Sequence, residues 1–550
     1  MQYFFRKIFS YAESQTWSWS RYFFTFLGII FIRGFLEKFS NPHWSGQFIT
    51  PLTAFFHYPL FYLSIFLSLN IVLYLFAFSK KSFYPSLKQV FQITLFGFLI
   101  IWLPPLVDFA VYHGNGPKMT YLFQPKGELI KSFFSFFGSL SQGGITLGIR
   151  IEVVLILIGF FFAITYYTGS KKKAFWGALL VYVLFFFYFA IPSIPPLVFA
   201  KVSSTREIML FYVHALSQSD LSKIYHIGAL SFNPRSSMDQ QFNLVMGRVL
   251  WLLILLQAMG LFYLANKTAF RAWCGNLRLE RVLHYGFMGI GGILIAAGYS
   301  RMVDLKSWIN ALSLTVFFLL IALHFWLAVG VNDLVDIKTD TVSNPSRPLI
   351  QGSITLQEQK IINGILLFLV IVGVFLLPYY TSVCLILFQM VYYLYSSPPL
   401  RLKKVFALSS LLVAFNAILI MMGGFYLVSE NQKMAAFPTH LSWLFLICFF
   451  LGVNIKDIKD IQGDALEKIQ TIPVLFGERR GKIIIGALCV VSFIIVPIVL
   501  QNKLLLIIAV PFSCFIYYFI NQKSYRENRV FSLYFLYLLA IGVCEKLVKF

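Results

Sequence analysis

Apolar segments long enough to cross a lipid bilayer recur along the whole chain, and this feature limits the possible folds more than any other. A transmembrane helix needs about 20 apolar residues to cross about 30 Å of hydrocarbon. The 550 residues are 59% hydrophobic and only 12% charged, which is too apolar for a soluble globular protein of this size. The hydrophobicity of each segment is continuous and does not alternate, which excludes a β-barrel. The predicted fold class is therefore all-α, a polytopic transmembrane helical bundle.

Windowed hydropathy predicts about fifteen spans in two groups. Six lie in the first half, near 22–36, 59–79, 90–107, 151–169, 174–200 and 243–265. Nine follow, near 282–300, 308–331, 360–377, 379–395, 405–428, 438–455, 483–500, 503–520 and 530–547. The polar, basic stretch 266–281 separates the two groups. We therefore expect a membrane domain of unknown function over residues 1–270 and a nine-helix bundle over residues 271–550.

The net charge of +23 raises the possibility of a nucleic-acid partner, so the position of the basic residues matters. They lie in loops between the spans, with about 28 Lys and Arg on one side and about 16 on the other, as the positive-inside rule expects. This asymmetry argues against nucleic acid and places the N-terminus in the cytoplasm. It predicts a multi-pass protein of the cell (inner) membrane. The six cysteines and eight histidines show no zinc-ligand spacing.

The segment VNDLVDIKTD directly follows the apolar run that ends at Gly330. Asn332, Asp336 and Asp340 are spaced i, i+4 and i+8, and Asp333 lies three residues before Asp336. A helical continuation would place these oxygens along one side of the helix. Three carboxylates at a membrane edge repel one another, so the motif predicts a bound cation.

A second acidic motif, KDIKDIQGD, follows another apolar run about 124 residues later in the chain. Asp457, Asp460 and Asp464 stand at i, i+3 and i+7. The predicted topology brings both motifs to the cytoplasmic ends of their spans. Two facing acidic clusters form an oxygen-rich site that suits Mg²⁺ together with the phosphates of a substrate. One motif alone would equally suit a solvated loop, but two together favour a site.

Basic and tyrosine side chains near these motifs are candidate diphosphate ligands, because arginine matches phosphate oxygens bidentately and lysine supplies a movable charge. The candidates are Arg347, Tyr395, Arg401, Lys403, Lys338 and Lys459. For Lys338 and Lys459, screening of the neighbouring acids is an equally good explanation. Lys404 is better explained as a charge that sets the topology.

Taken together, these motifs resemble those of the UbiA superfamily of intramembrane prenyltransferases. The resemblance covers roughly residues 278–550 and rests on NDLVDIKTD, NPSRPLIQGSIT, YSSPPLRLK and KDIKDIQGDALEKIQTIPVLFGERRG. The first carries the family's NDxxDxxxD pattern, and Asp460 to Asp464 carry its DxxxD pattern. In motif detail the chain is most similar to the branch of glycerol-lipid and chlorophyll synthases. The first 270 residues depart from the family's standard form.

The resemblance implies a Mg²⁺-dependent prenyltransferase that uses an isoprenoid diphosphate as donor and two Mg²⁺ ions as cofactors. The implied acceptor is a hydrophobic molecule with a hydroxyl or an activated aromatic carbon, reached within the membrane lipid. The implied metal ligands are Asn332, Asp336, Asp340, Asp460 and Asp464. The candidate catalytic residues are Asp333, Asp336, Asp340, Asp457, Asp460 and Asp464.

Two functions of another class are alternatives. A membrane transporter would account for fifteen spans, for the paired prolines of the first half and for the intramembrane Arg248. It would not account for two acidic motifs at one membrane face. A non-catalytic lipid-binding protein would not need all six motif aspartates.

Overall fold

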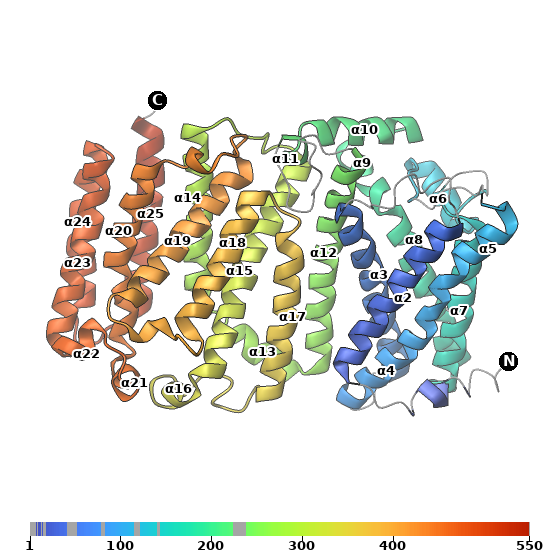
Figure 1. The fold of residues 1–550 in the computed structure, drawn as a ribbon, viewed down its shortest axis with the longest axis horizontal. Helices are drawn as coiled ribbons and strands as arrows, with labels where there is room; N and C mark the ends of the chain where they lie inside the picture. Colours follow the sequence, from blue (N-terminus) through green and yellow to red (C-terminus); the bar gives the residue numbers. More distant parts are fainter. Residues whose placement is uncertain are drawn as a thin grey trace. The chain divides into compact units, whose positions relative to one another are not determined.

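The computed structural model describes residues 18–40, 52–78, 83–114, 121–139, 144–223 and 238–548, with positions 7, 9–12 and 14. Residues 1–6, for which the charge distribution predicts a cytoplasmic position, lie outside this part. The chain divides into two compact units (Figure 1). Unit 1 comprises 1–217 and 236–267, and unit 2 comprises 218–235 and 268–550. Regular structure in the described residues is helical, which confirms the predicted all-α class.

Unit 1 consists of long helices joined by short ones. The long helices are α2 (Trp19–Ser40), α3 (Leu52–Leu73), α4 (Phe83–Phe98), α7 (Leu147–Thr168), α8 (Lys171–Ala190) and α12 (Met238–Ala265). The short ones are η2 (Tyr74–Phe78), η3 (Leu99–Trp102), α5 (Leu103–Tyr112), α6 (Lys126–Phe134), η4 (Ile191–Ser193), α9 (Ile194–Phe199) and α10 (Thr205–Ser217). Each proline pair of this unit lies in the first turn of α5 or α9, directly after a 3₁₀ turn. Proline is tolerated there because a first-turn residue needs no intrahelical N–H bond.

Arg33, which interrupts the first predicted span, is 2% exposed inside unit 1. Its guanidinium donates to Glu37 at 2.6 Å and to the Tyr58 hydroxyl at 2.7 Å, and it lies over the ring of Tyr62. The Tyr58 hydroxyl also donates to Glu37 at 2.9 Å. Burying an arginine in a membrane domain is costly unless its charge is paired and hydrogen-bonded. This cluster therefore explains how α2 accommodates a charge in its middle.

Unit 2 contains the helices that carry the acidic motifs. Its long helices are α14 (Leu279–Tyr299), α15 (Trp308–Val335), α17 (Leu356–Val374), α18 (Tyr379–Ser396), α19 (Leu408–Val428), α20 (Thr439–Gly452), α23 (Glu478–Val499), α24 (Lys503–Ile520) and α25 (Glu527–Val548). Its short helices are α11 (Asp220–Lys223), α16 (Ile337–Ser343), η5 (Leu402–Lys404), η6 (Met434–Ala436), η7 (Val453–Ile458), α21 (Ile461–Leu466) and α22 (Ile472–Phe476). The helix α13 (Lys267–Gly275) begins at the boundary between the units.

Thirteen helices of the described residues are long and apolar enough to cross a membrane. All fifteen predicted spans coincide with helices, but α2 and α18 do not meet the apolar criterion. The helix α2 has four charged side chains in its 22 residues, and α18 has five tyrosines in its 18. The protein is an integral multi-pass membrane protein, and α18 belongs to its bundle through packing against α19 and α15.

Helices α14 and α19 pack at very close range because glycines face one another between them. A Cβ added to Gly292 would lie 1.8 Å from the Met421 carbonyl oxygen, and one added to Gly424 would lie 2.1 Å from the Gly289 carbonyl oxygen. Small residues allow helix backbones to approach closely in a membrane, where dispersion replaces the hydrophobic effect as the attractive force. This contact fixes α14, which contributes to the site described below.

We expect Gly292→Ala to lower the free energy of unfolding by about 1–3 kcal/mol, because the added methyl meets backbone that cannot move aside. The matched control is Gly364→Ala on α17, where a Cβ meets nothing within 4 Å. Alanine in that helix is expected to be neutral or to stabilise by up to about 1 kcal/mol. Thermal unfolding of both variants in detergent checks the difference. Equal melting temperatures would contradict the close α14–α19 contact.

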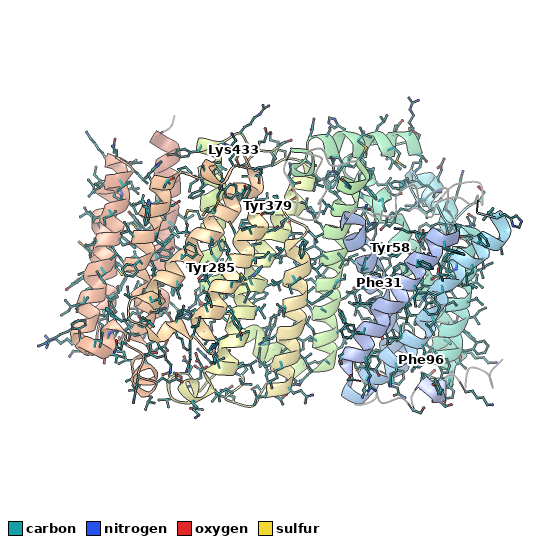
Figure 2. All side chains as sticks on the ribbon, in the orientation of Figure 1. Phe31, Tyr58, Phe96, Tyr285, Tyr379 and Lys433 are labelled. Atoms are coloured by element: carbon teal, nitrogen blue, oxygen red, sulfur yellow. The ribbon has the colours of Figure 1, made fainter. Side chains whose placement is uncertain are left out.

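Both acidic motifs lie where a long helix of unit 2 breaks into a short one. The helix α15 ends at Val335 and α16 begins at Ile337, whereas α20 continues through η7 into α21. The two short helices α16 and α21 pack against each other at one end of the bundle (Figure 1). Tyr379 and Lys433 lie toward the opposite end, with Tyr285 between the two ends (Figure 2). The fold therefore gathers both motifs at one end of unit 2, as the predicted topology requires.

Candidate active site

A single cavity of about 290 Å³ in unit 2 joins the two acidic motifs to an apolar interior. This volume is near the lower limit of typical small-molecule pockets. At one end its wall carries five carboxylates and five basic side chains: Asp336, Asp340, Asp457, Asp460, Asp464, Arg278, Arg281, Arg347, Lys403 and Lys456. Elsewhere the wall is mostly aromatic and aliphatic, with residues from α15, α19, α20, α23 and α25. The cavity thus has a charged end and an apolar arm.

The first motif does not continue as one helix, contrary to the simple prediction. The helix α15 stops at Val335, and Asp336 adopts φ −96° and ψ 20° before α16 begins. The amide of Asp336 still donates to the Asn332 carbonyl, and the amide of Asp340 donates to the Asp336 carbonyl, both at 2.9 Å. Asn332, Asp336 and Asp340 therefore all line the cavity despite the break.

Basic side chains hold the carboxylates of the first motif. Arg401 donates to Asp336 Oδ1 at 2.6 Å, and the Lys403 ammonium pairs with Asp336 Oδ2. Arg347 pairs with Asp340 and also donates to Asp333 Oδ1 at 2.9 Å. Charge-assisted bonds of this kind compensate the burial of both partners. Three predicted diphosphate ligands are therefore ion-paired with two predicted metal ligands in this structure.

The second motif presents its carboxylates from three consecutive turns. Asp457 lies in η7, Asp460 is the N-terminal cap residue of α21, and Asp464 lies in the first turn of that helix. All three line the cavity. The Oδ1 atom of Asp460 is buried and has no hydrogen-bond partner in the described part of the chain. A buried carboxylate oxygen without a donor is a position where a cation is favoured.

Burial raises the pKa of two motif carboxyl groups outside the spans. The pKa of Asp464 is raised to about 7 by burial first, and then by the negative charges of Asp457 and Asp460. The pKa of Asp340 is raised to about 6 by burial, although Arg347 opposes the shift. A carboxyl group with a raised pKa lacks sufficient positive charge nearby. The site therefore has the electrostatics of a cation-binding pocket.

The structure does not bring all the predicted residues to the cavity. Asn332, Arg347, Tyr395, Lys403 and the five carboxylates described above line it, whereas Asp333, Lys338, Arg401 and Lys459 do not. Asp333 instead accepts hydrogen bonds from Asn276 and Arg278 at 3.0 Å, as well as from Arg347. Lys338 is exposed, and Lys459 pairs with Glu527 at 2.5 Å. Arg401 reaches the site only through its bonds to Asp336 and Glu467.

Several cavity residues were missed because their sequence context explained them in another way. Arg278 and Arg281 belong to RLER, which suited a topology-setting cluster. In the fold they lie at the start of α14 and line the charged end. Lys456 is the first residue of the second motif, donates to the Tyr395 hydroxyl at 3.1 Å and lies 5.0 Å from the centre of that ring. His284, one turn beyond Arg281, carried no metal-binding spacing and so gave no signal.

The donor set fits a hard divalent cation, although the carboxylates do not yet converge on one. No group of three or more His, Cys, Asp or Glu side chains among the described residues is close enough to hold a metal ion. Carboxylate and amide oxygens around an orphaned, buried Asp460 oxygen are the chemistry that Mg²⁺ prefers. The basic partners of Asp336 and Asp340 occupy directions that a cation would otherwise use.

A membrane-embedded helical bundle with carboxylates, guanidinium groups and an apolar arm in one cavity has the chemistry to bind a lipid with an anionic group. Residues 289–539 match the model of the UbiA prenyltransferase family. This part of the chain is therefore similar to intramembrane prenyltransferases. The match lies entirely within unit 2, which holds the cavity.

Relatives of known name match part of the chain. A digeranylgeranylglyceryl phosphate synthase from Methanobrevibacter smithii is 24% identical over 259 residues, which are 44% of this chain and 87% of the relative. Its counterpart from Methanocaldococcus jannaschii is 27% identical over 224 residues, 40% of this chain and 71% of the relative. The structure of a UbiA homolog from Archaeoglobus fulgidus bound to GPP and Mg²⁺ is 16% identical, with a TM-score of 0.38. That alignment covers 49% of this chain and 96% of the homolog.

Proposed function

We propose that the cavity of unit 2 transfers a prenyl group from an isoprenoid diphosphate to the hydroxyl of a lipid acceptor, with Mg²⁺ bound by the acidic motifs. One observation carries this proposal: both acidic motifs and five basic side chains line the charged end of a cavity that continues into an apolar arm. A prenyl diphosphate has the same division between a charged head and an apolar tail. The names of the relatives favour a glycerol-phosphate lipid as the acceptor.

The residues of the charged end would exchange partners when the substrate binds. Asn332, Asp336, Asp340, Asp460 and Asp464 would hold the metal, which when bound supplies positive charge to the leaving diphosphate. Arg347 and Lys403 would then turn from Asp340 and Asp336 to the diphosphate oxygens. Tyr395, Arg401, Lys338 and Lys459 stay proposed ligands of the diphosphate, Arg401 through its contact with Asp336. This exchange keeps buried charges paired in both states.

The apolar arm would hold the prenyl tail and exclude water from the reacting carbon. Its wall includes Tyr285, Phe325, Phe449 and Phe493, which present aromatic faces or edges. An allylic carbocation that develops as the carbon–oxygen bond breaks is stabilised by aromatic faces. A dry cavity also delays its capture by water. These features favour transfer to a bound acceptor over hydrolysis.

The experiment that tests this function supplies isolated membranes with radiolabelled geranylgeranyl or farnesyl diphosphate, with and without Mg²⁺. Geranylgeranylglyceryl phosphate serves as the hydroxyl acceptor, and a native lipid extract tests other acceptors. A Mg²⁺-dependent labelled lipid that is lost in Asp336→Ala and Asp460→Ala supports the proposal. Absence of product from every donor, with the protein folded, would instead favour a transporter or a non-catalytic lipid-binding protein.

The charged end is also proposed to face the cytoplasm, because the basic loops cluster on that side. We expect a cysteine at Lys404, near the motifs, to react with a membrane-impermeant maleimide only in inside-out vesicles. A cysteine at Lys433, at the opposite end of unit 2, should react only in right-side-out vesicles. Both variants are made in a background in which exposed Cys514 is replaced by serine. The reverse labelling pattern would invert the proposed orientation.

A further inference from the structure

The transfer reaction releases a proton from the acceptor hydroxyl, and the cavity holds one imidazole that is placed to take it. The charged end is committed to the metal and to the diphosphate, so its carboxylates serve other roles. Among the other described residues that line the cavity, His284 is the only histidine, aspartate or glutamate. It is therefore the one imidazole or carboxylate among the described lining residues outside the charged end.

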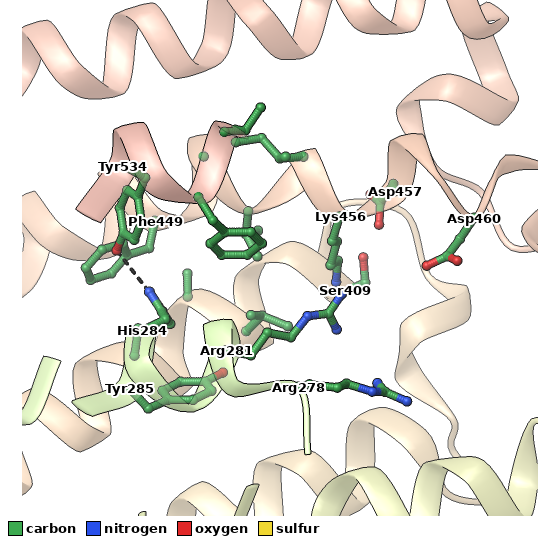
Figure 3. Close-up of a pocket in the computed structure, with 18 of the residues that line it drawn as sticks. Arg278, Arg281, His284, Tyr285, Ser409, Phe449, Lys456, Asp457, Asp460 and Tyr534 are labelled. Atoms are coloured by element: carbon green, nitrogen blue, oxygen red, sulfur yellow. Dashed lines mark hydrogen bonds between the residues drawn. The ribbon is translucent and has the colours of Figure 1, made fainter. Parts of the chain in front are cut away.

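His284 lines the cavity about one helical turn beyond Arg281 of the charged end, because it follows that residue by three positions on α14. Arg281 pairs with Glu527, the first residue of α25, while His284 meets Tyr534 seven residues along the same helix. Figure 3 shows Asp457 and Asp460 on one side, His284 and Tyr534 on the other, and Arg281 between them. An acceptor oxygen above the diphosphate would lie near this imidazole.

The contacts of the ring leave one nitrogen available. His284 Nδ1 lies 2.9 Å from the Tyr534 hydroxyl, the one hydrogen-bond partner that the ring has in the described chain. Three aromatic rings orient it: Tyr285 at 5.0 Å, Tyr534 at 5.6 Å and Phe449 at 5.8 Å between centroids. The Nε2 atom has no hydrogen-bond partner in the described residues. Unlike the Nε2 atom of His324, it is also not fully buried.

We infer that His284 is a catalytic base that accepts the proton of the acceptor hydroxyl, an inference that rests on the proposed function. The bond from the allylic carbon to the diphosphate breaks, and its electron pair leaves with the diphosphate. A lone pair of the acceptor oxygen forms the new bond to that carbon. The O–H bond then returns its electrons to oxygen, and the proton passes to His284 Nε2. In the reactive tautomer Nδ1–H donates to the Tyr534 oxygen, which leaves the Nε2 lone pair free to accept the proton.

The test uses the full-length protein in detergent with geranylgeranyl diphosphate, geranylgeranylglyceryl phosphate and Mg²⁺. His284→Asn keeps an amide near the Nδ1 position but has no proton acceptor. Since general base catalysis contributes at least about 100-fold, we expect transfer to fall about 100-fold. Ionisation of the donor needs only the charged end. The rate of ionisation is measured as the scrambling of ¹⁸O from the bridging to the non-bridging positions of the diphosphate. In His284→Asn this rate should stay within about threefold of wild type.

His440→Asn is the matched control, since this exposed histidine contacts Tyr299 and does not line the cavity. It should transfer at the wild-type rate. In His284→Ala, added imidazole should restore part of the lost rate. Should His284→Asn fail to fold, Tyr534→Phe replaces it, with transfer expected to fall about tenfold and scrambling retained.

Transfer by His284→Asn within threefold of wild type would overturn the inference, and so would equal losses of transfer and of scrambling. The second result would mean that His284 positions the donor and does not accept a proton. Failure of the proposed function looks different, because the wild-type protein itself would then show neither scrambling nor transfer with Mg²⁺.

Discussion

Asp460→Asn is expected to lower prenyl transfer by about 10³-fold while leaving the metal-free protein at least as stable as wild type. The loss in rate follows because charge stabilisation of a leaving group commonly contributes that much. The stability follows from the burial of Asp460 Oδ1 without a donor, beside the carboxylates of Asp457 and Asp464. Neutralising one of three crowded carboxylates removes repulsion and an uncompensated buried charge. Turnover and melting temperature in detergent, each with EDTA and with Mg²⁺, measure both effects.

Mg²⁺ should raise the melting temperature of wild type, because a ligand that binds only the folded state stabilises it. Mg²⁺ should raise the melting temperature of Asp460→Asn much less. The control is Asp304→Asn, an exposed carboxylate that accepts a hydrogen bond from the backbone of Lys306 and does not line the cavity. That variant should keep its activity and its response to Mg²⁺. An Asp460→Asn protein that retains full activity would remove this residue from the proposed metal site.

Arg347→Met is expected to lower the free energy of unfolding by about 3–5 kcal/mol and to abolish prenyl transfer. The single guanidinium pairs with both Asp333 and Asp340, and it lines the cavity as a proposed diphosphate ligand. Removing one partner from a buried ion pair leaves the other charge uncompensated, which is the costly case. Chemical denaturation in detergent measures the stability, and the labelled-donor assay measures the rate. The control is Arg480→Met, since Arg480 is exposed and has no hydrogen-bond partner among the described residues.

The stability loss of Arg347→Met should depend on pH, and the double variant Arg347→Met/Asp340→Asn should recover most of it. The folded-state pKa of Asp340 is already raised to about 6, and Arg347 is the group that lowers it. Without Arg347 this pKa rises further, so the folded state binds more protons than the unfolded state over a wider range. Stability then falls as pH rises from about 4 through the folded-state pKa. The loss of unfolding free energy on Arg347→Met, measured in EDTA, should therefore be larger at pH 8 than at pH 6. Equal losses at the two pH values would show that the unpaired charge of Asp340 is not their cause.

Sequence patterns were sufficient to predict the helices and most of the side chains at the charged end of the cavity. The i, i+4, i+8 spacing in the first motif and the i, i+3, i+7 spacing in the second predicted two converging acidic clusters. The structure places Asn332, Asp336 and Asp340 in one cavity with all three aspartates of the second motif. Spacing succeeded even though α15 breaks at Asp336, because the backbone bonds across the break preserve the turn. The membrane spans were recognisable because an uninterrupted segment of about 20 apolar residues has the length of a transmembrane helix.

Spacing could not decide which side of the helix Asp333 faces. It lies within the same motif, but Asn276 and Arg278 from the start of unit 2 hold it away from the cavity. The same limit applies to Lys459, whose partner Glu527 lies 68 residues along the chain. Such pairings depend on which helix ends meet in the fold, and the local sequence does not predict these contacts.

The amino-acid sequence by itself determined that the chain spans a membrane many times, that it is all-α, and that two acidic motifs end two of its spans. These properties depend on hydrophobic length and on helical periodicity, which are local. Only the tertiary structure decided that Arg281 and His284 share a cavity with residues of those motifs, and that Asp333 does not line it. The reason is physical: the close contact of α14 with α19 and the packing of α14 against α25 place the start of α14 beside the second motif.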